Sequence, residues 1–209
     1  MYREWEFSGE LVEKFATYHR HSYACKTGVG DVLIGAAQLL AESQGIAKAS
    51  HVKDKIVEMI HLNETMACCS MACSYEGRQE PSGTYFVNDL WANVNKLNVT
   101  RFPYEMARLA QEIAGGALVT LPSETDLKSP AVGHYVSKYL VGVDGVPIEN
   151  RIRLLRLIEN LTMGLGAVSY LTESLHGAGS PQAQRIMISR LANMDRMKNN
   201  AARIAGISK

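Results

Sequence analysis

The sequence predicts an all-α protein, a bundle of about five or six long helices. Apolar residues recur every three or four positions over long stretches, and convincing strand alternation appears nowhere. The chain has 209 residues, of which 46% are hydrophobic and 21% charged, enough for a substantial core. Its composition is uniform and without internal repeats, so we expect one domain over residues 1–209.

The first two expected helices cover 8–22 and 32–41. Ser8 is a suitable cap for the first helix, whose apolar residues recur at intervals of three and four. Gly28 and Gly30 are expected to interrupt the chain before the second. That second helix is apolar nearly all round, which is typical of a buried element.

The next two expected helices cover 51–76, with Ser50 as its cap, and 84–118. A polar loop separates them. A break is expected near Phe102 and Pro103, because proline readily starts a new helix. Gly115-Gly116 lies inside an apolar run, and each glycine costs a helix about 1 kcal/mol relative to alanine. This cost indicates close packing or a ligand contact.

The remaining expected helices cover 131–140, 149–174 and 181–204. The segment around the first of these is irregular and rich in proline and glycine. The helix over 149–174 is the clearest amphipathic element. The last helix would begin with Ser180 as its cap and Pro181 in its first turn.

Composition and charge exclude several classes of function. The net charge is +1, which gives no electrostatic basis for binding nucleic acid or an anionic membrane. No apolar run is long enough to span a membrane, and Met1 to Glu6 lacks the start of a signal peptide. The four cysteines show no secreted disulfide framework, so we expect a reducing, cytoplasmic environment.

The stretch from His19 to Lys26 concentrates chemically useful side chains. Imidazole binds metals or protons, and a thiolate is a soft metal ligand. At about 100° per residue, a continuous helix places His19, Tyr23 and Lys26 on one side and Cys25 roughly opposite. Recruiting Cys25 requires the helix to deform near Ala24. The alternative is an ordinary helix end with a buried cysteine and surface polar residues, and the spacing leaves both open.

Two other groups have a structural explanation that we favour. Cys69 and Cys73 share a helix face with Cys68 nearby, but no second pair stands at zinc-site spacing, so packing explains them better. His61 and Glu64 lie three residues apart on the same helix, where core or surface roles are expected.

A glycine-rich loop, 177–181, precedes the last helix. Free N–H groups at a helix start bind phosphate, although a plain turn between helices explains the loop equally well. It is not a dinucleotide-binding fingerprint, because a helix and not a strand precedes it. Glu173 stands just before this loop, at the expected C-terminus of a long helix. Burial and the helix dipole would raise its pKa, which suits a general acid or base.

Several stretches together resemble the C-terminal part of the 4-hydroxybutyryl-CoA dehydratase (vinylacetyl-CoA Δ-isomerase) family, within the 4-hydroxyphenylacetate 3-hydroxylase superfamily. They are Tyr18 to Ala37, Ala49 to Lys55, His61 to Thr65, Asn98 to Glu105 and Thr172 to Arg185. The last is the most specific. The resemblance covers nearly all of this chain and implies a helical bundle similar to the C-terminal domain of acyl-CoA dehydrogenases. The N-terminal half of the family enzyme is absent.

The resemblance implies FAD and a [4Fe-4S] cluster held by three cysteines and one histidine. The implied reaction dehydrates 4-hydroxybutyryl-CoA to crotonyl-CoA. His19 and Cys25 match cluster ligands, Tyr23 and Lys26 match active-site neighbours, and Glu173 matches a carboxylate beside the substrate. The candidates for flavin contacts are Gly115, Gly116, Gly177, Gly179 and Ser180.

The sequence departs from the family pattern in two ways. The pattern has one more residue between tyrosine and cysteine, which would return the cysteine to the face of the histidine. The other two cysteine ligands, with most of the CoA and flavin pocket, belong to the absent half, so an N-terminal partner chain is expected. Relatives form tetramers, which implies a homo-oligomer.

Two alternatives remain. One is a flavin-dependent phenol hydroxylase component, such as a 4-hydroxyphenylacetate 3-hydroxylase. The other is a helical oligomerisation fragment without chemistry of its own.

Overall fold

The computed structural model describes residues 4–207. Met1 to Arg3, which belong to the N-terminal stretch that lacks the features of a signal peptide, lie outside the described residues. Its elements in chain order are α1 (Trp5–Ser22), α2 (Cys25–Ser43), α3 (Ser50–Tyr75), β1 (Arg78–Gln79), β2 (Tyr85–Phe86), α4 (Asp89–Val99), α5 (Phe102–Ala114), η1 (Gly116–Leu118), α6 (Glu124–Lys128), α7 (Gly133–Tyr139), α8 (Ile148–Thr162), α9 (Leu165–Ala167), η2 (Val168–Thr172), η3 (Glu173–Leu175), α10 (Pro181–Leu191) and α11 (Met194–Ile204). The predicted all-α class is confirmed.

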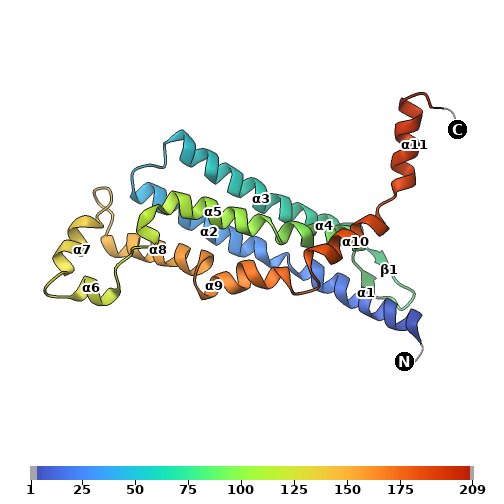
Figure 1. The fold of residues 1–209 in the computed structure, drawn as a ribbon, viewed down its shortest axis with the longest axis horizontal. Coiled ribbons are helices and arrows are strands. Elements are labelled where there is room, and N and C mark those ends of the chain that lie inside the picture. The colour runs from blue at the N-terminus through green and yellow to red at the C-terminus, as the bar shows by residue number, and fades with distance from the viewer. Residues whose placement is uncertain (1–3, 208–209) are drawn as a thin grey trace.

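The core lies between four helices, α2, α3, α5 and α8, which pack against one another along the body of the molecule (Figure 1). Leu33 and Leu40 of α2, Met59 of α3, Met106 of α5 and Leu155 of α8 are fully buried in one cluster. The prediction that the apolar segment 32–41 is buried is confirmed for one side of the helix, which carries Leu33, Ala37 and Leu40. On the other side Val32 and Leu39 are about half exposed, so that part of the prediction is wrong.

The expected interruption at Gly28 and Gly30 is wrong, because α2 runs through both. A Cβ atom at Gly30 would collide with the side chain of Asn63 on α3. The glycine is needed for close approach of two helices and not for a turn. The expected start of the first helix is also wrong: α1 begins at Trp5, and Ser8 lies inside it.

The prediction for 84–118 also needs correction. Its first residues form β2, which pairs antiparallel with β1, and α4 starts only after Asn88, whose side chain accepts a bond from Trp91 N at 3.0 Å. The expected break near Pro103 is confirmed, since α5 begins at Phe102. The helix expected over 51–76 is α3, although Ala49 and not Ser50 occupies the N-cap position.

The single helix expected over 149–174 is broken. α8 ends at Thr162, and the chain continues through α9, the π-helical turn η2 and the 3₁₀ turn η3. The side chain of Asn160 accepts a bond from Gly166 N at 3.2 Å across the break. Such changes in winding redirect side chains and are frequent at functional sites.

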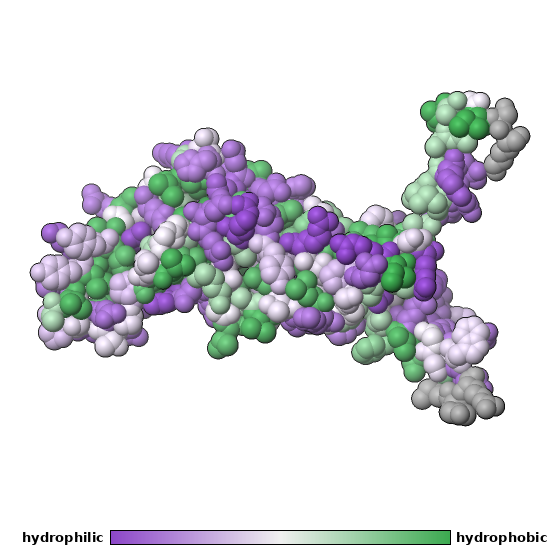
Figure 2. Space-filling model, in the orientation of Figure 1, coloured by the Kyte–Doolittle hydropathy of each residue, from purple (hydrophilic) through white to green (hydrophobic). Residues whose placement is uncertain are grey.

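The last expected helix, 181–204, is two helices. Pro181 starts α10 as predicted, but Ser180 makes no capping bond with its side chain. The chain breaks at Ala192, and α11 then projects from the body with none of its residues buried (Figure 1). Figure 2 shows both hydrophobic and hydrophilic residues on this arm, as on the surface of the body. Across residues 4–207, no helix is both long and apolar enough to cross a membrane.

Candidate functional site

The junction between α1 and α2 is a tightened turn. Tyr23 N bonds to Arg20 O at 3.3 Å, Ala24 N to His21 O at 3.1 Å, and Lys26 N to Tyr23 O at 3.0 Å. These bonds span three residues, and such winding turns the chain by about 120° per residue instead of about 100°. The deformation that the sequence required near Ala24 is therefore present.

This tightening returns Cys25 to the side of His19. Cys25 is six residues after His19, and a regular α-helix turns by about 600° over six residues. Each tightened step adds about 20°, which brings Cys25 closer to two full turns and so toward the side of His19. Cys25 and His19 consequently line one cavity of about 180 Å³. Its lining residues are His19, Ser22, Tyr23, Cys25, Lys26 and Glu173. The thiol of Cys25 is free and the residue is exposed.

Glu173 comes to this cavity from a distant segment of the chain. The Tyr23 hydroxyl donates to its Oε1 atom, and Lys26 Nζ lies 3.3 Å from its Oε2 atom. Lys26 also donates to Ser169 O in the π-helical turn. The His19 ring stacks on Tyr23 at 5.7 Å between centroids. An imidazole, a phenol, an ammonium and a carboxylate therefore converge within one small space.

The carboxyl of Glu173 is more acidic than expected. Partial burial acts to raise its pKa, but hydrogen bonds from Tyr23 and Lys26, and the charges of Lys26 and Lys96, outweigh burial and lower it. The predicted upward shift is wrong because the side chain is 44% exposed and lies among cations rather than at the end of a long helix. At neutral pH Glu173 is a carboxylate.

The phenol of Tyr23 shows the opposite shift. Burial is the largest cause that raises its pKa, and the hydrogen bond to the negative Glu173 raises it further. Tyr23 therefore keeps its proton at neutral pH. The pair consists of a protonated donor and an ionised acceptor that share a hydrogen bond.

Lys96 belongs to this cluster, although the sequence did not single it out. Its side chain is fully buried, donates to Ser174 O, and places Nζ 4.0 Å from the centroid of the Tyr23 ring. Burial lowers the pKa of Lys96 to about 8. One signal was available in the sequence: α4 is rich in asparagine, which is not a favoured residue inside a helix.

The glycine-rich loop closes over the same site. A Cβ atom at Gly177 would collide with the Tyr23 hydroxyl and Glu173, so this position requires glycine. Arg20 Nε donates to Ala178 O at 3.0 Å, and Gly179 has a positive φ of 95°. These contacts favour a role in closing the site. Whether Gly177, Gly179 and Ser180 also touch a flavin stays a prediction.

Gly115 and Gly116 lie apart from this cluster. The two glycines follow the C-terminal end of α5. The contact with the site is at the other end of this helix, where the carbonyl of Val99 accepts a bond from Ser174. Gly115 has a φ of 70°, which ends the helix, and nothing lies within 4 Å of a Cβ built at either glycine. Helix termination explains Gly115, and the close packing considered for the pair is absent.

The prediction that the other three cysteines are packing residues is confirmed in part. Cys73 is buried and Cys69 half-buried, and burial raises the pKa of both thiols, but Cys68 is exposed. His61 pairs with Glu58 at 3.5 Å on the surface. Within residues 4–207, no three histidine, cysteine or acidic side chains lie close enough to hold a metal.

Known proteins resemble this chain closely. A family model described as 4-hydroxyphenylacetate 3-hydroxylase C terminal matches residues 8–206. A 4-hydroxybutyryl-CoA dehydratase/vinylacetyl-CoA-Δ-isomerase from Clostridium aminobutyricum is 54% identical over 98% of this chain and 44% of its own length. An oxygen-tolerant archaeal 4-hydroxybutyryl-CoA dehydratase from N. maritimus superposes with a TM-score of 0.94 at 58% identity, over 99% of this chain and 41% of that one.

A more distant structure shares the fold. The oxygenase component of 4-hydroxyphenylacetate 3-monooxygenase, complexed with FAD, has a TM-score of 0.79 at 26% identity, over 88% of this chain and 39% of that one. The chain thus spans less than half the length of these relatives. Because the family model covers nearly all of its residues, the chain belongs to the 4-hydroxyphenylacetate 3-hydroxylase C-terminal family.

Proposed function

We propose that this chain is the C-terminal helical part of an enzyme that dehydrates 4-hydroxybutyryl-CoA to crotonyl-CoA and isomerises vinylacetyl-CoA. The observation that carries the proposal is the cavity in which His19, Tyr23, Cys25, Lys26 and Glu173 meet. The two dehydratases that resemble the chain at 54% and 58% identity supply the reaction class. The rest of the enzyme lies on a separate partner chain or in a further segment.

The donor set fits part of an iron–sulfur site. An imidazole and an accessible thiol line one cavity, and both are established ligands of iron–sulfur centres. The described residues add no third ligand there. His19 and Cys25 would therefore bind a [4Fe-4S] cluster together with cysteines from outside this chain. Such a cluster supplies a Lewis acid for the departing hydroxyl group.

The flavin is proposed from the relatives, one of which is complexed with FAD. Within this chain, contacts to Tyr23, Glu173 and Arg20 explain the loop glycines, and nothing approaches Gly115 or Gly116. The described residues do not by themselves form a flavin site, and the proton transfers proposed below involve only side chains of this chain.

The proton chemistry follows from the ionisation states of Tyr23 and Glu173. Converting vinylacetyl-CoA to crotonyl-CoA removes a proton from C2 and adds one at C4. Glu173 is ionised at neutral pH, since its pKa lies below the usual value, so the carboxylate is available to accept the C2 proton. Tyr23 supplies a proton and recovers one from Glu173 through their hydrogen bond. Lys26 orients the carboxylate through its contact with Oε2.

The cavity favours this reaction over a phenol hydroxylase. A flavin-dependent oxygenase has no need of a soft metal ligand, whereas Cys25 is exposed to the space that His19 also lines. The hydroxylase relatives also match over a smaller share of the chain: the Thermus thermophilus protein is 32% identical over 72% of it.

The test is to co-express the chain with the N-terminal part of a dehydratase and to purify the pair without oxygen. We expect bound iron, sulfide and flavin, and conversion of vinylacetyl-CoA to crotonyl-CoA. Bound FAD without iron would instead support the hydroxylase alternative. A colourless oligomer that binds neither cofactor, alone or with the partner, would support a non-catalytic fragment.

A further inference from the structure

Lys96 contacts the candidate site from the protein interior. It lies on α4 and does not line the cavity, yet its Nζ atom lies 4.0 Å from the centroid of the Tyr23 ring. The same atom donates to Ser174 O, one residue after Glu173. None of the side chain is exposed. A buried ammonium group is costly unless it is hydrogen-bonded and near compensating charge, so these contacts make its burial tolerable.

The charges around Lys96 come from three other elements. The carboxylate of Glu173 in η3 attracts the ammonium group, whereas Lys26 of α2 and Arg20 of α1 repel it. α4 packs against α1, which leads into the junction that carries Tyr23, and against α10, which follows the loop after Glu173. Lys96 contacts both Tyr23 and Ser174.

We propose that Lys96 is a positioning residue, which holds the face of the Tyr23 ring and the carbonyl of Ser174 so that the Tyr23 hydroxyl meets Glu173. Tyr23 and Glu173 are 150 positions apart in the sequence, so nothing local fixes their distance. A cation attracts both an aromatic face and a carbonyl oxygen, and this single group does both. A neutral side chain of similar volume fills the space without either attraction.

This role of Lys96 belongs to the proposed function of the same site. Only the kinetic measurement below depends on that function, whereas the structural measurement does not. The structural measurement uses the 209-residue chain without a partner. The variant is Lys96→Met, which keeps length and removes the charge. Lys138→Met is the matched control, because Lys138 also lies over a tyrosine ring, 5.6 Å from the Tyr139 centroid, but on the surface.

Hydrogen–deuterium exchange provides the structural measurement. The amides of His176 and Gly177 both bond to Glu173 O at 3.0 Å and report on this turn. In Lys96→Met we expect these amides to exchange roughly tenfold faster or more, because a charge-assisted hydrogen bond that held the turn is lost. Lys138→Met is expected to exchange as the unchanged protein does.

The kinetic measurement uses the chain assembled with its N-terminal partner. We expect Lys96→Met to lower turnover roughly tenfold or more while KM for the CoA ester changes little, since the residue acts through Tyr23 and not on the substrate. In a Tyr23→Phe background the effect of Lys96→Met should shrink, because the hydroxyl it positions is gone.

Unchanged exchange in folded Lys96→Met, or an undiminished effect in the Tyr23→Phe background, would overturn the proposal. If Lys96→Met does not fold, Lys96→Gln replaces it, and unchanged exchange in that variant also overturns it. An unmodified assembly without activity refutes the proposed function, while the exchange rates still decide the role of Lys96.

Discussion

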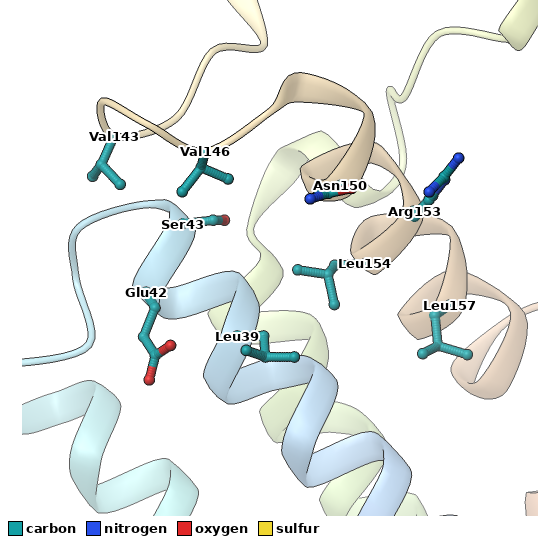
Figure 3. A pocket seen from close by; sticks show the side chains of 9 residues that line it. All are labelled: Leu39, Glu42, Ser43, Val143, Val146, Asn150, Arg153, Leu154 and Leu157. Atoms are coloured by element: carbon teal, nitrogen blue, oxygen red, sulfur yellow. The ribbon is translucent and has the colours of Figure 1, made fainter.

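The two ends of α2 border cavities of very different character. At its start, Cys25 and Lys26 line the small cavity of about 180 Å³. At its end, Leu39 and Ser43 line a larger one of about 640 Å³, which α8 closes from the other side (Figure 3). The larger cavity is bordered mainly by aliphatic side chains such as Leu154.

The difference teaches that convergent chemistry, and not volume, marks the candidate site. At the small cavity, hydrogen bonds connect a phenol, an ammonium and a carboxylate from segments far apart in the sequence. The pKa of the Tyr23 phenol is raised and that of the Glu173 carboxyl is lowered. At the large cavity, the side chain of Glu42 accepts a bond from Gln38 on its own helix. Opposed shifts in one cleft are the usual signature of acid–base chemistry.

The largest expected effect separates the two cavities by activity. In the assembled enzyme, Glu173→Gln should lower turnover by about 10² to 10⁴, because it removes the proton acceptor. Glu42→Gln at the other end of α2 is the matched control and should retain full activity. The assay follows crotonyl-CoA formation from vinylacetyl-CoA. Equal activity in the two variants would remove Glu173 from the proposed chemistry.

The next effect concerns iron. Cys25→Ala should cost the assembled protein most of its iron, because the proposed function makes this thiol one of the cluster ligands. Cys68→Ala changes another exposed thiol, on α3, and should leave the iron content unchanged. Iron and sulfide are quantified after anoxic purification. Full iron in the Cys25 variant would show that the tightened turn does not bring this thiol to the metal.

A smaller effect is a pH dependence of stability at Lys96. The unfolded lysine holds its proton up to a pKa of about 10.5, whereas the folded one releases it near a pKa of about 8. Between these values the unfolded state binds more protons, so raising the pH stabilises the fold. Urea denaturation should show the unfolding free energy of the unchanged protein rising across this window relative to Lys96→Met. If the unfolding free energies of the two proteins change with pH in the same way, Lys96 is not a buried group with a lowered pKa.

The smallest effect is expected at the large cavity. Leu157 borders it and is partly exposed, so Leu157→Ser should change the free energy of unfolding by no more than about 1 kcal/mol. Thermal denaturation gives the shift, and iron content and turnover should match those of the unchanged protein. Loss of iron or turnover in this variant would mean that the two ends of α2 are coupled.

The sequence predicted the helical class, the buried side of α2 and the long α3, because the pattern of apolar residues reports helix formation and burial. It misplaced the boundaries where tertiary contacts override local preference. Gly30 lies inside α2 because α3 requires close approach there. The helix expected to reach residue 174 ends at Thr162, where the chain turns through Asn160 and Gly166 and changes its winding.

The site was predicted as residues and not as an arrangement. His19, Tyr23 and Lys26 followed from spacing on one helix, and Glu173 from its position before the glycine-rich loop and from the resemblance. The direction of its pKa shift could not follow, because the cations around the carboxylate come from α2 and α4. Lys96 escaped notice because a lysine within a helix is usually solvated, and only packing shows that this one is buried.

By itself, the sequence determined which side chains are available between His19 and Lys26 and that the helices around them bury a core. Only the three-dimensional structure decided which way Cys25 faces, because bonds spanning three residues at the α1–α2 junction turn it toward the cavity that His19 also lines. It also decided that Tyr23 meets Glu173 above the ammonium group of Lys96. Helical periodicity acts over a few residues, whereas the energy of a buried charge depends on every element packed around it.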